Sequence, residues 1–128
     1  MKFTRLFTED KLDVYNKLKF KTTSSEIKNP DGTIVFSAPE IEVPENYSQV
    51  AADVIAQKYF RKAGVPTFLK RVKESNVPEW LSRSEPDEYK LETIPEDERY
   101  GAEISAKQVF DRLAGTWTYW GWKGGYFS

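Results

Sequence analysis

The chain has 128 residues, a formal net charge of −1 and 30% charged side chains. This length accommodates one domain with its own core, and no apolar run approaches the ~20 residues of a membrane-spanning helix. The sequence contains neither cysteine nor histidine. It therefore excludes disulfides, thiol nucleophiles, zinc sites built on thiolate or imidazole, and the commonest general base.

The first 43 residues predict an arm followed by a β-hairpin region. Residues 1–17 carry apolar side chains without a sustained period, so we expect an arm there. In the hairpin region, residues 18–43, two strand-like segments at 19–28 and 33–37 flank Asn29-Pro30-Asp31-Gly32. Proline presets φ and Asp-Gly accommodates a positive φ, which is typical of a hairpin turn. A further strand at 40–43 lies between Pro39 and Pro44, which favours a sheet edge.

Residues 47–62 predict the first amphipathic helix. Asn46 is a candidate N-cap, with Gln49 three residues later. Gly64 and Pro66 follow and should end the helix. The expected apolar face consists of Tyr47, Ala51, Val54, Ile55 and Tyr59, widened by Val50 and Phe60, and the expected polar side consists of Asp53, Gln57 and Arg61.

Residues 65–101 predict a long loop divided by several prolines. Within it, we expect Trp80 to anchor the loop in the core. A basic block at 58–73 and an acidic block at 85–98 are expected to pair with each other.

Residues 103–117 predict the second amphipathic helix, within a helical region that covers 47–117. Ser105 and Gln108 form a capping-box pattern, and Gly124 and Gly125 should end the helix if neither earlier glycine does. Its expected apolar face consists of Ile104, Val109, Phe110, Leu113 and Trp117. The expected fold is thus a small α+β domain in which a β-hairpin precedes two main helices joined by a long proline-containing loop.

Aromatic side chains gather at the end of the chain, at Trp117, Trp120, Trp122, Tyr126 and Phe127. Each such ring buries ~150–250 Å² when it is packed, so together they need a partner surface. The domain's own core, a second copy or a continuation of the polypeptide could supply it. Stacking on sugars or bases is an alternative, but Trp117 continues the face of Leu113, which favours packing. We therefore treat the five residues as domain-interface candidates.

The basic stretch offers an alternative binding surface at Arg61, Lys62, Lys70 and Arg71, which are interleaved with aromatic residues. Under that interpretation, the protein would be a free-standing module for nucleotides or nucleic acid. The near-neutral net charge makes nucleic acid an unlikely partner, and the aromatic residues also suit core packing. A stand-alone adaptor that self-associates through its aromatic end is a third interpretation. No residues are spaced for a metal site, and the N-terminus lacks a signal-peptide pattern, so we expect a cytoplasmic protein.

Four segments carry a resemblance to a known family: SEIKNPDGTIVF (25–36), YSQVAADVIAQKYFRKAGVP (47–66), VPEWLSRSEPD (77–87) and GAEISAKQVFDRLAGTWTYWGWKGGYF (101–127). In order and spacing they resemble the N-terminal domain of class II, adenosylcobalamin-dependent ribonucleotide reductases. The resemblance is weak over residues 1–15, and Tyr47 stands where the family usually has tryptophan.

The resemblance implies an enzyme that makes 2′-deoxyribonucleotides from ribonucleotides. In that family, homolysis of the cobalt–carbon bond generates a thiyl radical on a cysteine inside a catalytic barrel, and a cysteine pair then reduces the substrate. This chain has no cysteine. It is therefore expected to hold no catalytic residue, no metal and no bound cofactor, with adenosylcobalamin belonging to the parent enzyme. Residues 1–128 would be a single structural domain, whose residues 118–128 form the junction to the catalytic barrel.

Overall fold

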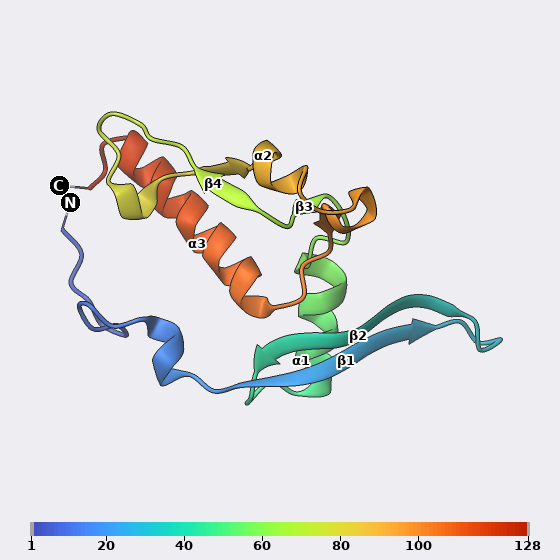
Figure 1. The fold of residues 1–128 in the computed structure, drawn as a ribbon. Coiled ribbons are helices and arrows are strands. Elements are labelled where there is room, and N and C mark those ends of the chain that lie inside the picture. The colour runs from blue at the N-terminus through green and yellow to red at the C-terminus, as the bar shows by residue number, and fades with distance from the viewer. Residues whose placement is uncertain (1, 128) are drawn as a thin grey trace. The chain divides into compact units, whose positions relative to one another are not determined.

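The computed structural model describes residues 2–127 (Figure 1). Met1 and Ser128, the outer ends of the predicted arm and junction, lie outside the described residues. The chain forms two compact units. The first, called the hairpin unit, contains residues 2–60 and 104–109, and the second, called the loop unit, contains residues 61–103 and 110–127. The fold is α+β, as predicted.

A β-hairpin forms the framework of the hairpin unit. Strand β1 (Phe20–Lys28) pairs antiparallel with β2 (Ile34–Pro44). At the turn, the Asn29 N–H donates to the Thr33 carbonyl at 2.7 Å, and Gly32 has a φ of +89°. The predicted turn is therefore confirmed.

Strand β2 is continuous where two short strands were predicted. Thr23 lies opposite Ile41 but Ser25 lies opposite Ala38, so β2 has one extra residue beside Pro39. A bulge of this kind accommodates proline, which has no N–H to donate to the ladder. A second irregularity between Ile27 and Lys28 leaves Val35 as an extra residue of β2.

The first helix is shorter than predicted and changes its winding. Helix α1 (Gln49–Val54) continues as a π-helical turn, η2 (Ile55–Tyr59), and Phe60 is extended. The N-cap is Ser48, whose Oγ accepts from the Ala51 N–H at 3.1 Å, so the assignment of Asn46 was wrong. The reason is that the Tyr47 N–H donates to the Pro44 carbonyl at 3.0 Å, which places Asn46 inside a turn before the helix.

The predicted orientation of this helix was only partly correct, since Ile55 and Phe60 are buried but other members of the predicted apolar face are not. Ser25 of β1 is buried, donates its hydroxyl to Asp53 Oδ1 at 2.7 Å and accepts from Gln57 Nε2 at 3.2 Å. The predicted polar side therefore faces the hairpin, because β1 presents hydroxyl groups to it. Three members of the predicted apolar face are instead exposed: Val50, Val54 and Tyr59. The buried apolar residues of the hairpin unit are Ile41, Val43, Ala52, Ile55, Ala56, Phe60, Ala106 and Val109.

Residues 65–101, predicted as a loop, fold into short paired pieces within the loop unit. Strands β3 (Val65–Pro66) and β6 (Tyr100–Gly101) pair with each other, as do β4 (Leu69–Arg71) and β5 (Ser84–Pro86). Single turns lie between them: η3 (Glu79–Leu81), α2 (Glu88–Leu91) and η4 (Glu96–Glu98). Lys70 lies opposite Glu85 and forms an ion pair with it at 3.4 Å, which joins the basic and acidic blocks as expected.

Leucines rather than tryptophan anchor this segment. Leu81 and Leu91 are buried, whereas Trp80 is 68% exposed, so its prediction as a core anchor was wrong. Successive residues of the η3 turn point in different directions, and Leu81 takes the inner position.

The second helix, α3 (Ala106–Lys123), runs beyond the predicted range. Its capping box is confirmed, since Gln108 Oε1 accepts from the Ser105 N–H at 3.0 Å. At its end, the Gly125 N–H donates to the Trp122 carbonyl and the Tyr126 N–H to the Gly121 carbonyl, each at 3.0 Å. With a φ of +74° at Gly125, these bonds form a Schellman motif. The glycine pair therefore ends the helix, as predicted.

The apolar face predicted for this helix is only partly buried. Val109 is buried in the hairpin unit, whereas Ile104 and Trp117 are exposed.

The N-terminal arm contains a short 3-10 turn, η1 (Val14–Lys17), capped by Asp13.

We expect Ile41→Ala to lower the free energy of unfolding by about 3 kcal/mol, because Ile41 is 2% exposed and its truncation leaves a cavity. Ile34→Ala is the matched control, in the same strand but 57% exposed, and should change that free energy by about 0.5 kcal/mol or less. Urea unfolding of the two variants measures the difference. Equal losses would contradict the assigned core.

Candidate domain interface

The five aromatic interface candidates fall into two groups. Trp117, Trp120 and Tyr126 are 63%, 64% and 67% exposed, whereas Trp122 and Phe127 are half-buried. Trp122 Nε1 donates to the Asn76 carbonyl at 2.6 Å. The Phe127 ring covers Gly121, where an added Cβ would lie 2.5 Å from the ring. The second group thus has partners within the loop unit, and the first group stays largely in water.

A cluster around Glu74 determines which face of α3 meets water. The Glu74 carboxylate accepts from Tyr119 Oη at 2.8 and 2.9 Å, from Arg83 Nε at 2.9 Å and from Lys123 Nζ at 3.4 Å. Tyr119 and Lys123 are four residues apart and share one helical face. That face is held against the loop, so Trp117 and Trp120 point elsewhere.

The same hydrogen bonds shift two pKa values in opposite directions. The Tyr119 hydroxyl is the main cause that lowers the pKa of Glu74, with help from Lys123 and Arg83. Its bond to Glu74 in turn raises the pKa of Tyr119. No local sequence pattern reveals this cluster, because its members come from three separate segments of the chain.

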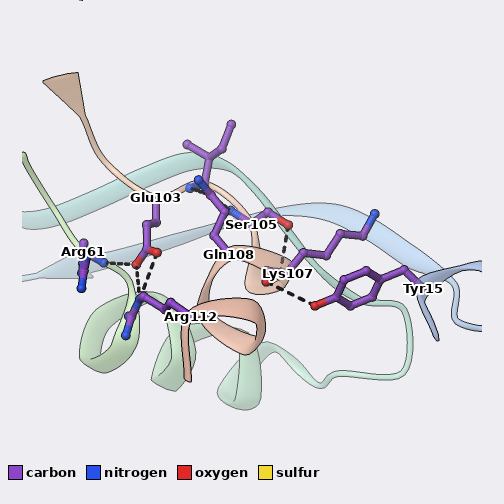
Figure 2. Close-up of polar contacts among 8 residues, drawn as sticks. Tyr15, Arg61, Glu103, Ser105, Lys107, Gln108 and Arg112 are labelled. Carbon is purple, nitrogen blue, oxygen red and sulfur yellow. Dashed lines mark hydrogen bonds and ion pairs between the residues drawn. The ribbon is translucent and has the colours of Figure 1, made fainter. Parts of the chain in front are cut away.

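A second carboxylate, Glu103, is buried in the loop unit and fully paired (Figure 2). Its Oε1 accepts from the Arg61 N–H at 2.7 Å, and Arg112 Nε lies 3.0 and 3.2 Å from the two carboxylate oxygens. The Glu103 N–H donates to the Arg61 carbonyl at 2.8 Å. Arg61 therefore contacts Glu103 through the N–H and carbonyl of its own main chain.

In the hairpin unit, the end of the N-terminal arm is anchored by Tyr15. Its hydroxyl donates to the Lys107 carbonyl at 3.2 Å (Figure 2), and its ring packs edge-on against Phe20. Lys107 Nζ lies 4.5 Å from the centroid of the Phe20 ring, within cation–π range. Earlier in the arm, apolar side chains are strongly exposed: Phe3, Leu6 and Phe7.

The alternative basic surface is partly occupied by local contacts. Lys70 pairs with Glu85, and Arg71 Nη1 donates to the Glu79 carbonyl at 3.0 Å. Arg61 and Lys62 are exposed. The side chains of Lys70 and Arg71 are thus already engaged within the loop unit.

The described part of the chain offers no cluster of side chains suited to a metal ion. Within residues 2–127, no group of three acidic, cysteine or histidine side chains could hold a metal ion. Every buried side-chain nitrogen or oxygen described has a hydrogen-bond partner, and the sequence offers no imidazole as a ligand. Across the same residues, no helix has the length and apolar character needed to cross a membrane.

Comparisons with known proteins extend over the whole chain. A family described as class II vitamin B12-dependent ribonucleotide reductase matches residues 21–128. The chain is 59% identical over 128 residues to a protein named vitamin B12-dependent ribonucleotide reductase from Agrobacterium fabrum, and 58% identical over 128 residues to one of the same name from Bradyrhizobium diazoefficiens. Each match covers 100% of this chain and 10% of the relative. The chain thus spans about a tenth of the length of these relatives, and the matches include the arm.

The shifted pKa of Glu74 predicts a pH dependence of stability. Because this pKa is lowered from its ordinary value of 4.5, the contribution of the carboxylate is present above that value and is lost as pH falls through the folded-state pKa. The stability difference between the native protein and Glu74→Gln should therefore shrink as pH falls from about 7 to about 3. Urea unfolding at several pH values measures it.

Tyr119→Phe serves as the matched control, since it removes the main hydrogen bond but keeps the ring. In this variant the acid-side loss of stability should begin at a higher pH. A stability difference that stays constant across the acid range would contradict the role of Glu74.

We expect Glu103→Ala to lower the free energy of unfolding by about 3 kcal/mol, because it removes a buried carboxylate that accepts from the Arg61 N–H and from the Arg112 guanidinium. Glu98→Ala, at an exposed glutamate of the same unit, should cost about 0.5 kcal/mol or less. Thermal and urea unfolding provide the comparison. A loss no greater than that of the control would show that the pair does not stabilise the unit.

Proposed function

Because the chain belongs to the family of class II vitamin B12-dependent ribonucleotide reductases, we propose that it is the N-terminal structural domain of a cytoplasmic reductase that converts ribonucleotides to 2′-deoxyribonucleotides for DNA synthesis. The family chemistry needs cysteine thiols, and this chain has none. The domain is therefore not catalytic by itself. Its role is to pack on the catalytic remainder of the enzyme.

The observation that carries this proposal is the exposed aromatic face of α3, formed by Trp117 and Trp120 of the helix together with Tyr126 just after its end. Burial of these rings would remove roughly 300–500 Å² from water, a gross gain of about 8–12 kcal/mol at ~25 cal/mol per Å². The costs of ordering and association reduce this figure, but a partner within the same polypeptide avoids most of them. The catalytic barrel is the partner we propose for this face.

Local contacts hold the aromatic face in place before any partner arrives. The Glu74 cluster fixes the rotation of α3 about its own axis, and the Schellman motif at Gly125 fixes the end of the helix. A surface fixed in this way loses little conformational entropy on docking. This preorganisation supports an interface role for Trp117 and Trp120.

Adenosylcobalamin, the cofactor proposed for the parent enzyme, belongs in the remainder of that enzyme. The donor set of the described residues does not fit this group, because it includes no imidazole and no buried polar atom without a partner. No step of the proposal passes through it. The alternative of a nucleotide or nucleic-acid module has less support, since Lys70 and Arg71 are engaged by local carboxylate and carbonyl groups.

We expect Trp117→Ala to weaken the binding of residues 1–128 to the separately produced remainder of the reductase by about 30-fold. This factor corresponds to about 2 kcal/mol, the usual cost of truncating an interface tryptophan. Isothermal titration calorimetry measures the affinity, and recovery of ribonucleotide reduction on mixing reports the assembled enzyme. Trp120→Ala should act in the same direction.

Trp80→Ala is the matched control, since Trp80 is 68% exposed but belongs to η3 and not to α3. It should change the affinity by less than about threefold. Equal effects at all three tryptophans would rule out a specific interface at α3. Reductase activity of the remainder that does not depend on residues 1–128 would overturn the proposed role of the domain.

A further inference from the structure

The turn end of the hairpin displays apolar side chains that are partly exposed to solvent. This segment, residues 26–36, is called the hairpin tip. Ile27, Ile34 and Val35 are 38%, 57% and 61% exposed. The hydrogen bonds from α1 and η2 meet β1 at Thr23, Ser24 and Ser25. The ribbon then continues past the helix to its turn (Figure 1).

A dense set of polar contacts holds the hairpin tip in shape. Asp31 Oδ1 accepts from the Thr33 N–H at 3.0 Å and from Thr33 Oγ1 at 2.6 Å, and Asn29 Nδ2 donates to Thr33 Oγ1 at 3.0 Å. The same Thr33 contacts lower the pKa of Asp31. A two-stranded ribbon without a packed face is only marginally stable in water. These hydrogen bonds therefore supply stability that the exposed apolar side chains do not provide.

A preformed ribbon with exposed aliphatic side chains is suited to docking, since little entropy remains to be lost. Full burial of the three side chains would remove roughly 200–400 Å² from water. A stable complex between separate chains buries about 1,200–2,000 Å² in total, so this patch is too small for a second copy. A partner attached to the same polypeptide has an effective concentration in the millimolar range, about 10⁻³ M, and a small patch then suffices.

The relatives supply such an attached partner, because the chain covers only 10% of their length. We propose that the hairpin tip docks into an apolar groove on the remainder of the same reductase polypeptide. Ile27 lies opposite Phe36 and Ile34 lies opposite Lys28, so Ile27 and Ile34 are on opposite faces of the ribbon. The groove therefore receives both faces of the tip, and the exposed Lys28–Glu26 ion pair, 3.2 Å long, stays at its rim. This inference rests on the proposed function and adds a second contact, separate from the aromatic face of α3.

Site-specific photo-cross-linking in the full-length reductase tests the proposal. With p-benzoylphenylalanine in place of Ile34, irradiation should join the hairpin tip to a peptide outside residues 1–128 of the same polypeptide. The yield should not depend on protein concentration. The same cross-linker in place of Glu40, an exposed position nearer the other end of β2, should give a yield at least fivefold lower.

A second variant tests the same contact without a cross-linker, which could itself disturb the fold. In Ile34→Ser/Val35→Ser full-length reductase, amide hydrogens of the remainder that are protected by the docked tip should exchange at least threefold faster. Cross-links only to a second copy, or none outside residues 1–128, would overturn the proposal, and so would unchanged exchange. The outcome is separable from the proposed function, because the affinity loss in Trp117→Ala tests that function without involving the hairpin tip.

Discussion

The carboxylate of Glu74 constrains α3 through two side chains of the helix, Tyr119 and Lys123, and is itself held by Arg83 of the loop. Tyr119, Lys123 and Arg83 all bond to it, so the C-terminal part of the helix is held against the loop and cannot roll. Trp117 and Trp120 remain in water as a consequence. The polar contacts of Glu74 thus offset the unfavourable exposure of the two large aromatic rings.

The two proposed contact surfaces share a design although one is a helix and the other a ribbon. In both, apolar side chains are displayed while polar networks, centred on Glu74 and on Asp31, hold the backbone. This arrangement suits the structural role that we propose for a chain with no thiol of its own. In that proposal, the domain contributes by shape and contact, and the reacting groups come from the remainder of the reductase.

Sequence reasoning succeeded where the signal was local. The hairpin turn, the capping box of Ser105 and the glycine stop at Gly125 each depend on residues a few positions apart. It failed where the deciding partner was distant. Asp53 faces the hairpin only because a buried serine lies opposite it, and Glu74 meets Tyr119 across 45 positions. No periodicity within either segment encodes such a pairing, and the same holds for the small strand pairs of residues 65–101.

The π-helical turn η2 makes this part of the fold sensitive to deletions. The Phe60 N–H reaches back to the Ile55 carbonyl, so the turn holds one residue more than an α-helical turn would. Loss of a single codon there would restore regular winding and rotate the following residues by ~100° about the axis. Gln57 would then miss Ser25, and Phe60 would leave the core. Deletions in this turn should therefore be purged by selection even where substitutions at the exposed Lys58 or Tyr59 are accepted.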